Sequence, residues 1–128
     1  RSVSRGLGDV YKRQGSCSIF RKTLGEVMNN EHMFDIAKGC ALEARKMGDL
    51  KKVNFTFENT VEYITEFGKK LLHSKPSMLQ DIEAKKLCEI DAINGMVVTL
   101  GEKNNIKTPY NSVVTSLIKA QELEYEKK

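Results

Sequence analysis

The sequence predicts an all-α fold. After residue 18, apolar residues recur at helical spacing, several segments start with capping residues, and no set of alternating strands appears. The chain has 128 residues, about the size of one domain, and 40% of them are hydrophobic. That share is enough to bury a core and is unlike the composition of disordered chains. We therefore expect a single helical domain.

Two apolar stripes predict the first helices. The first has the spacing i, i+4, i+7 and i+8 and consists of Phe20, Leu24, Val27 and Met28. The second runs from Met33 to Met47, with charged residues on the opposite side, and Gly48 is expected to stop this helix. Residues 51–57, KKVNFTF, alternate briefly and are expected to form an extended connector.

Capping signals predict the helices in the second half of the chain. Asn59, with Glu62 three residues later, is expected to cap a helix that ends at Lys75-Pro76. Ser77 and Gln80 have capping-box spacing, which predicts a helix from Met78 to about Lys86. Thr108-Pro109 starts the last helix, whose apolar stripe is Tyr110, Val113, Val114, Leu117 and Ile118.

Between these elements, a helix is expected from near Cys88 to about Asn104. Its apolar face consists of Ile90, Ile93, Met96, Val97 and Leu100. Glu89 lies at the edge of this face in the expected first turn, where the helix dipole favours an acidic side chain. Gly95 lies inside the pattern and is interpreted as a close helix–helix contact.

Composition argues against several classes of protein. The formal charge is +4, but residues 1–14 carry +3 of it, so the rest carries only +1, which disfavours a nucleic-acid-binding protein. No apolar run approaches the roughly 20 residues needed to span a bilayer. The scattered thiols Cys17, Cys40 and Cys88 indicate a reduced, cytoplasmic protein. Only two histidines are present, His32 and His73, so no metal site is expected.

The first fourteen residues, RSVSRGLGDVYKRQ, differ in character from the rest. Gly6-Leu7-Gly8 is not a dinucleotide-binding loop, because Tyr11 stands where the third small residue belongs and no strand precedes it. The stretch SRGLGDVYKRQ resembles an in-frame translation of a transposase sequencing adapter. We therefore expect residues 1–14 to be a non-native leader and residues 15–128 to be the helical domain. Since no initiator Met is present, the natural sequence is expected to extend upstream.

Residues 76–122 carry a family resemblance. Their sequence is PSMLQDIEAKKLCEIDAINGMVVTLGEKNNIKTPYNSVVTSLIKAQE. It resembles the end of the ketopantoate reductase (2-dehydropantoate 2-reductase) family. The family pattern is Ser-Met-Leu-Gln-Asp, a Thr-Glu-Ile-Asp-like stretch, Asn-Gly and Thr-Pro-x-Asn, and all four pieces occur in order. Cys88 stands where the family usually has Thr. Residues 17–48 also look like the family's preceding helices.

The resemblance implies a fold and an activity. The fold would be the helical C-terminal domain of the ketopantoate reductase and 6-phosphogluconate dehydrogenase type, truncated at its N-terminal end and lacking the N-terminal Rossmann domain. The complete enzyme would reduce ketopantoate to pantoate with NADPH, on the route to pantothenate and coenzyme A. The fragment alone is expected to be inactive. Partners would be a 2-oxo acid and a second subunit in a homodimer, with no nucleic acid and no membrane.

The resemblance also implies site residues. Ser77 would bind the carboxylate end of the substrate. Glu89 would face the cleft near the nicotinamide ribose, where it would keep a catalytic lysine charged. That lysine, in a Lys-x-x-x-Asn context, is expected upstream of this chain. Lys22 precedes Asn29 and Asn30, but its neighbours match the family's next segment, so it is not assigned.

Two alternatives stay open. The parent enzyme could act on another 2-oxo acid, which only a panel of substrates separates. The chain could also be a small helical interaction or nucleic-acid-binding module. That module should have a basic face, yet Arg21 and Arg45 are the only arginines after the leader.

Overall fold

The computed structural model describes residues 3–12, 14–55 and 57–125, which fold into helices with no strand among them. The prediction of an all-α fold is therefore confirmed. In chain order the elements are α1 (Val3–Tyr11), α2 (Gln14–Phe20), α3 (Leu24–Met28), α4 (Glu31–Leu50), α5 (Thr60–Lys70), α6 (Ser77–Glu83), the 3₁₀ turn η1 (Ile90–Ala92), α7 (Asn94–Lys103) and α8 (Pro109–Glu124).

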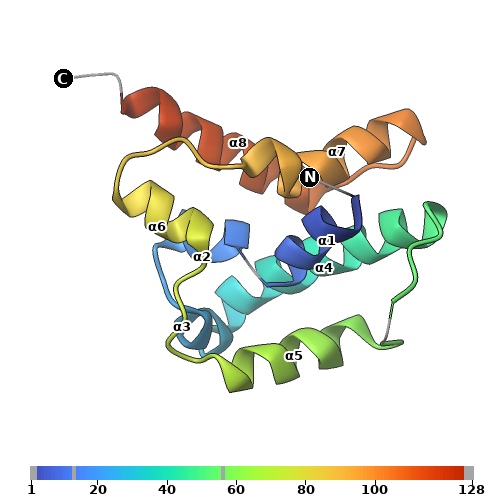
Figure 1. The fold of residues 1–128 in the computed structure, drawn as a ribbon, viewed down its shortest axis with the longest axis horizontal. Coiled ribbons are helices and arrows are strands. Elements are labelled where there is room, and N and C mark those ends of the chain that lie inside the picture. The colour runs from blue at the N-terminus through green and yellow to red at the C-terminus, as the bar shows by residue number, and fades with distance from the viewer. Residues whose placement is uncertain (1–2, 13, 56, 126–128) are drawn as a thin grey trace.

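The longest helix, α4, organises the fold. Figure 1 shows it crossing the middle of the molecule, with α5 along one side and α7 and α8 along the other. Its predicted stripe is confirmed, because the buried side chains include Ala37, Cys40, Ala41, Ala44 and Met47. The stop predicted at Gly48 is wrong. Gly48 lies inside α4, and a Cβ there would meet the Phe55 ring at 2.3 Å, so this glycine admits an aromatic side chain.

The first apolar stripe is divided between two helices. Helix α2 ends at Phe20, Arg21 adopts φ 55°, and α3 begins at Leu24. Thr23 and Glu26 form a reciprocal capping box at this start. Asn29 and Asn30 cap the end of α3 and the start of α4, so both have structural roles. Lys22 lies in the turn between α2 and α3.

The cap predicted before α5 is confirmed, because the Asn59 side chain accepts a hydrogen bond from the Glu62 amide. The predicted connector is non-helical over residues 51–55 and 57–59, but it begins with a turn in which Lys52 adopts φ 57°, and residue 56 lies outside the described residues. However, α5 ends at Lys70, well before Pro76. The carbonyls of Leu72 and Ser74 accept hydrogen bonds from the Gly25 and Leu24 amides instead. The chain therefore leaves α5 early to pair with the start of α3.

The helix predicted from Cys88 is wrong in its first six residues. Residues 86–89 are non-helical, η1 covers three residues, and Ile93 (φ −113°, ψ −97°) interrupts the helical path before α7. Ile90, Ile93, Val97 and Leu100 are nevertheless buried as expected. The nearest atoms to a Cβ at Gly95 belong to the short η1 turn, with the Ile90 carbonyl oxygen at 3.1 Å, rather than to one of the α-helices.

Helix α8 starts at Pro109 as predicted, but only part of its stripe is buried. Val114 and Ile118 are fully buried, together with Asn111. Tyr110, Val113 and Leu117 remain 42%, 58% and 46% exposed. The stripe is wider than the surface that α4 and α7 cover.

Helix α1 packs into the same core. Leu7, Val10 and Tyr11 are buried, and the Tyr11 ring meets Phe55 and Phe57 edge-on at 5.8 and 5.3 Å between centroids. Gly6 to Gly8 are helical, in agreement with the rejection of a phosphate-binding loop. That residues 1–14 are a non-native leader stays a prediction.

Candidate functional site

Ser77 lies at the start of α6, but it does not cap this helix. Pro76 occupies the N-cap position, and no side chain of the predicted capping box bonds to the first turn. Gln80 instead donates from Nε2 to the Lys75 carbonyl at 3.0 Å. The capping-box prediction is therefore wrong, because the chain enters α6 one residue earlier than expected.

The cap comes from a distant residue, Gln14. Its Oε1 accepts hydrogen bonds from the Ser77 hydroxyl and from the Met78 amide, both at 3.1 Å. The Met78 N–H can only donate, so it fixes which end of the Gln14 amide faces α6. The Ser77 hydroxyl must then be the donor. Gln14 is only 7% exposed and ties α2 to α6.

A cavity of about 380 Å³ opens beside this contact, between α2 and the α5–α6 connection. Its polar walls include Gln14, Ser74 and Ser77, and its cationic walls are Lys12 and Lys75. The ammonium of Lys75 lies 3.3 Å from the Glu83 carboxylate in an exposed ion pair. Hydroxyl groups and lysines together suit a small anion, such as a carboxylate.

Glu89 lies on a different part of the surface. It is exposed, with φ −90° and ψ 36°, and immediately precedes η1. It is therefore not in the first turn of an α-helix, and the predicted helix-dipole explanation is wrong. The neighbouring Cys88 amide donates to the Glu122 carboxylate at 2.8 Å, which anchors this segment to α8.

Ser77 and Glu89 are held by different packing contacts. Helix α6 packs on α2, whereas η1 packs on α7 and α8. Glu89 does not line the cavity beside Ser77. That the two residues share one substrate cleft stays a prediction.

A polar cluster that the sequence patterns did not predict joins α4, α7 and α8. Asn94 donates from Nδ2 to Asn111 Oδ1 at 2.9 Å. Asn111 Nδ2 is within bonding distance of the Cys40 carbonyl, at 3.1 Å, and Glu43 Oε1, at 2.8 Å. Glu43 also accepts from the Tyr110 and Asn111 amides, each at 3.0 Å, so it caps α8.

The cluster uses two pieces of the family pattern, Asn94-Gly95 and Thr108-Pro109-x-Asn111. Both asparagines are almost fully buried, with exposures of 1% and 0%. A signal was present in the sequence, because Asn111 is in phase with Val114 and Ile118 on the buried face. A Cβ at Gly15 would lie 2.5 Å from Asn94 Oδ1, so this position admits only glycine without a shift. These residues stabilise the helix junction.

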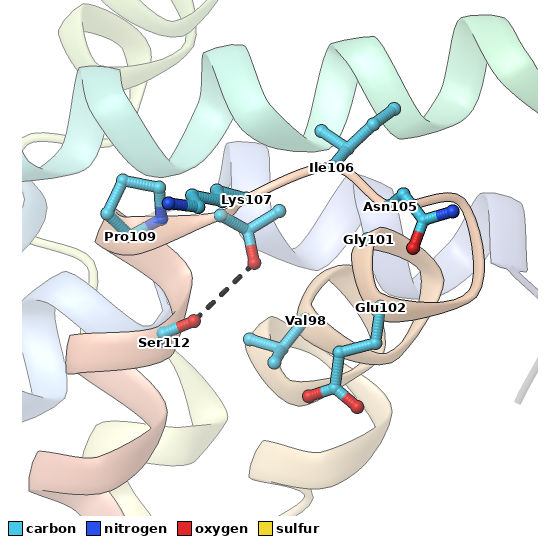
Figure 2. Close-up of a pocket in the computed structure, with 9 residues that line it drawn as sticks. Val98, Gly101, Glu102, Asn105, Ile106, Lys107, Pro109 and Ser112 are labelled. Carbon is cyan, nitrogen blue, oxygen red and sulfur yellow. Dashed lines mark hydrogen bonds between the residues drawn. The ribbon is translucent and has the colours of Figure 1, made fainter.

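A second cavity, of about 580 Å³, lies at the corner between α7 and α8 (Figure 2). In that view Ile106 points toward α4, whereas Glu102 extends away from it. The Thr108 and Ser112 hydroxyls are 3.5 Å apart. Two charged residues line this cavity, Glu102 and Lys107, and both are exposed at the surface. We therefore assign no reaction to the cavity.

Cys40 and Cys88 are unsuited to nucleophilic chemistry. Burial raises the pKa of Cys40 to about 12, and burial also raises the pKa of Cys88 to about 12. The thiolate is the reactive form, so both groups are unreactive at neutral pH. Within residues 3–12, 14–55 and 57–125, no group of three or more His, Cys, Asp or Glu residues could hold a metal ion.

Among the helices that the structure describes, none is both long and apolar enough to cross a membrane.

Comparison with known proteins gives a consistent family. Residues 14–122 match the family model "Ketopantoate reductase PanE/ApbA C terminal". A 2-dehydropantoate 2-reductase from Streptococcus pyogenes serotype M3 is 35% identical over 108 residues, and one from Aquifex aeolicus is 31% identical over 110. These matches cover 84% and 83% of this chain. The chain spans only 35% of the length of either relative.

Solved structures share the fold. A ketopantoate reductase from Ralstonia eutropha has a TM-score of 0.86 at 18% identity, covering 97% of this chain and 41% of that one. A D-mandelate dehydrogenase with NADH and anilino(oxo)acetate has a TM-score of 0.82 at 23% identity, covering 98% and 70%. A dimeric ketopantoate reductase from Staphylococcus aureus has a TM-score of 0.79 at 21% identity, covering 96% and 43%. The chain therefore belongs to the ketopantoate reductase family, of which it carries the C-terminal helical domain.

Proposed function

We propose that this chain is the substrate-binding domain of an NADPH-dependent 2-dehydropantoate 2-reductase. The observation that carries the proposal is the family match over residues 14–122, together with curated relatives that bear this name. The missing nucleotide-binding domain would hold most of the cofactor. When bound, the nicotinamide would supply hydride to the keto carbon of the substrate.

In this proposal Ser77 binds the carboxylate end of the substrate. The cavity beside it supports the role, because Lys75 and Lys12 place positive charge near the hydroxyl. The Ser77 proton currently points to Gln14 Oε1. Donation to a substrate carboxylate therefore requires the hydroxyl to turn away from Gln14, while the Met78 amide keeps Gln14 in place. Lys12 and Gln14 both belong to the predicted leader, so the natural protein would retain Lys75 as the cation but not the contact between Gln14 and Ser77.

We further propose that Glu89 accepts a hydrogen bond from the nicotinamide ribose and keeps a catalytic lysine protonated. An exposed carboxylate before a short turn fits both tasks, since ribose hydroxyls and ammonium groups are donors. The ammonium would protonate the oxygen of the reduced keto group. Helix α1 contains no lysine or asparagine, and its one cation is Arg5. The lysine would therefore come from sequence outside these 128 residues.

The domain assignment belongs to the same proposal. Residues 1–14 would be a leader that replaces part of the natural protein, and residues 15–128 would be the native domain. The family match supports this, because it begins at residue 14. Sequencing the source DNA upstream of Gly15 tests it. A Lys-x-x-x-Asn helix there agrees with the proposal, and a natural RSVSRGLGDVYKRQ reading frame contradicts it.

A reductase of another 2-oxo acid is the second candidate. The shared fold with a protein described as D-mandelate dehydrogenase, solved with NADH, favours considering it. The experiment is a spectrophotometric assay of the full-length protein with ketopantoate and a panel of 2-oxo acids, each with NADPH and NADH. Fastest turnover of ketopantoate with NADPH supports the proposal. Preference for another 2-oxo acid or for NADH selects the second candidate.

The 128-residue chain is the matched control in this assay. We expect it to oxidise no NADPH, because the nucleotide-binding domain is missing. Measurable turnover by this chain would contradict the proposed division of roles. We also propose that the parent enzyme is cytoplasmic, as its free thiols indicate, and that it forms a homodimer.

A further inference from the structure

Helix α6 ends in a tight turn that redirects the chain toward α8. Two backbone bonds close this turn, from the Lys85 amide to the Ile82 carbonyl at 3.1 Å and from the Lys86 amide to the Asp81 carbonyl at 2.8 Å. With Lys85 at φ 55°, these bonds form a Schellman motif, a common end of a helix. Residues 86–89 then belong to no helix, and the connection runs beside α8 before it reaches η1 (Figure 1). Glu89 is therefore carried by non-helical backbone.

Helix α8 holds this connection at two points, one on each side of Glu89. The Cys88 amide donates to Glu122 Oε2 at 2.8 Å. The Lys119 ammonium lies 2.8 Å from Asp91 Oδ1. Lys119 and Glu122 are three residues apart in α8, so they lie on the same side of this helix. One side of α8 therefore contacts both the residue before Glu89 and the turn after it.

The contact made by Glu122 is the stronger of the two. The side chains of Lys119 and Asp91 are 51% and 75% exposed, so water screens their ion pair. Glu122 is half-buried, and a carboxylate that accepts from a backbone N–H forms a charge-assisted hydrogen bond. An acid in the last turn of α8 is disfavoured by the helix dipole, which is negative at that end. The bond from the Cys88 amide offsets this cost.

The backbone of Glu89 is fixed from both sides. On one side Ile90 is 2% exposed and belongs to the core. On the other side Cys88 is bonded to Glu122, and α8 is a fixed support because Ile118, one turn before Glu122, is fully buried. A substitution at Ile90 would open the core. The Glu122 bond is the contact that a substitution can remove without opening it.

We propose that Glu122 is a positioning residue of the reductase site, because it holds the backbone that carries Glu89. Glu122 touches neither substrate nor cofactor in this proposal and acts through the Cys88 amide. A misplacement of about 1 Å in a site can lower the rate about 100-fold, so a carboxylate on non-helical backbone needs such an anchor. This inference rests on the proposed role of Glu89 and names the residue that sets its position.

Steady-state kinetics of the full-length enzyme, with the 2-oxo acid that it reduces fastest, test the proposal. Glu122→Ala removes the acceptor, so kcat should fall about 10-fold while the KM for the 2-oxo acid changes less than about two-fold. Glu122→Gln keeps an oxygen that accepts from the Cys88 amide and should restore most of kcat. Glu102→Ala, which removes an exposed acid from α7, is the matched control. Normal kcat in Glu122→Ala, or a glutamine variant as slow as the alanine variant, overturns the proposal.

A double-mutant cycle shows whether Glu122 acts through Glu89. In the Glu89→Ala enzyme, the further change Glu122→Ala should lower kcat by less than about two-fold. A full additional loss means that Glu122 acts on another part of the site, which overturns the inference. Normal turnover of Glu89→Ala alone overturns the proposed role of Glu89, and this inference with it.

Amide hydrogen exchange of the 128-residue chain measures the anchor without any turnover. In Glu122→Ala the Cys88 amide should exchange at least about 10-fold faster, whereas the Val97 amide inside α7 should keep its rate. Circular dichroism on heating shows whether the variant folds. If it does not, Glu122→Asp replaces it, since the shorter side chain draws the carboxylate away from the Cys88 amide.

Unchanged exchange at Cys88 in a folded variant overturns the anchor, whatever the enzyme reduces. Faster exchange at Cys88 with no turnover of any 2-oxo acid by the full-length protein instead overturns the proposed reductase function. The two failures are therefore distinguishable.

Discussion

Two polar regions of this domain carry the family pattern, and they differ in burial. Asn94, Asn111 and Glu43 form a cluster across α4, α7 and α8 in which Asn111 and Glu43 are paired. Asn94 donates to Asn111, but its Oδ1 has no hydrogen-bond partner. Ser77 and Glu89 are exposed at helix starts. Buried polar groups cost free energy unless they are paired, so most groups of the first region are paired within the protein. The second region is open to solvent.

The residues of a family pattern are subject to two kinds of constraint, one from stability and one from function. The asparagines are required because three helices meet around them, whatever the substrate is. Ser77 and Glu89 are exposed, and their proposed roles in the site stay predictions. The predictions that follow separate stability from function at these two regions.

The largest effect is expected for Asn111→Ala. It removes the partner of the buried Asn94 side chain and takes one donor from the half-buried Glu43. Each unsatisfied buried group costs about 1–3 kcal/mol, so the free energy of unfolding should fall by roughly 3 kcal/mol. Urea denaturation measures it, with the exposed Asn54→Ala as control. Equal losses in the two variants would show that the cluster is not stabilising.

The next effect concerns pH and the thiol of Cys40 beside this cluster. Burial raises its pKa to about 12, whereas the unfolded thiol titrates near 9. As pH rises, the Cys40 thiol therefore loses its proton first in the unfolded state. Its contribution to the free energy of unfolding is complete below pH 9 and declines as pH rises toward 12. The free energy of unfolding should fall with a slope that approaches about 1 kcal/mol per pH unit. Denaturation between pH 7 and 10 measures it, and Cys40→Ala should reduce the slope. An unchanged slope would contradict it.

A smaller change in the free energy of unfolding is expected at Asn59, which caps a helix, than in the buried cluster, and a still smaller change at Ser77, which does not cap one. Asn59 accepts the Glu62 amide, so Asn59→Ala should lower the free energy of unfolding by about 1 kcal/mol. Ser77 makes no cap bond within α6, and the Met78 amide keeps its bond to Gln14 without the hydroxyl. Ser77→Ala should therefore cost less than Asn59→Ala in the same denaturation assay. The reverse order would mean that the hydroxyl contributes more than this geometry indicates.

The smallest effect on stability is expected at Glu89. Because its side chain is exposed, Glu89→Ala should change the free energy of unfolding by less than about 0.5 kcal/mol. In the full-length reductase the same change should lower turnover strongly, as the proposed role requires. Glu102→Ala, also exposed, is the matched control for both assays. Near-normal turnover of the Glu89 variant would remove this residue from the proposed site.

Helix-scale features were predictable from the sequence because they depend on local spacing. The apolar stripe of α4, the cap at Asn59 and the start of α8 at Pro109 were all correct. Errors arose where a distant residue supplied the deciding contact. Gln14 caps α6 in place of the capping box expected at Ser77, and the Phe55 ring packs beside Gly48. Cys88 bonded to Glu122 instead of continuing a helix.

By itself, the sequence determined the helical class, the starts of α5 and α8 and the family pattern, because periodicity and capping act within one or two turns. Only the tertiary structure decided which polar residues are buried and which face solvent. Asn111 and Ser77 each lie near the start of an apolar stripe. Asn111 is nevertheless fully buried, whereas Ser77 is exposed. The physical reason is that burial depends on which helices cover a face, and that is set by packing across the chain.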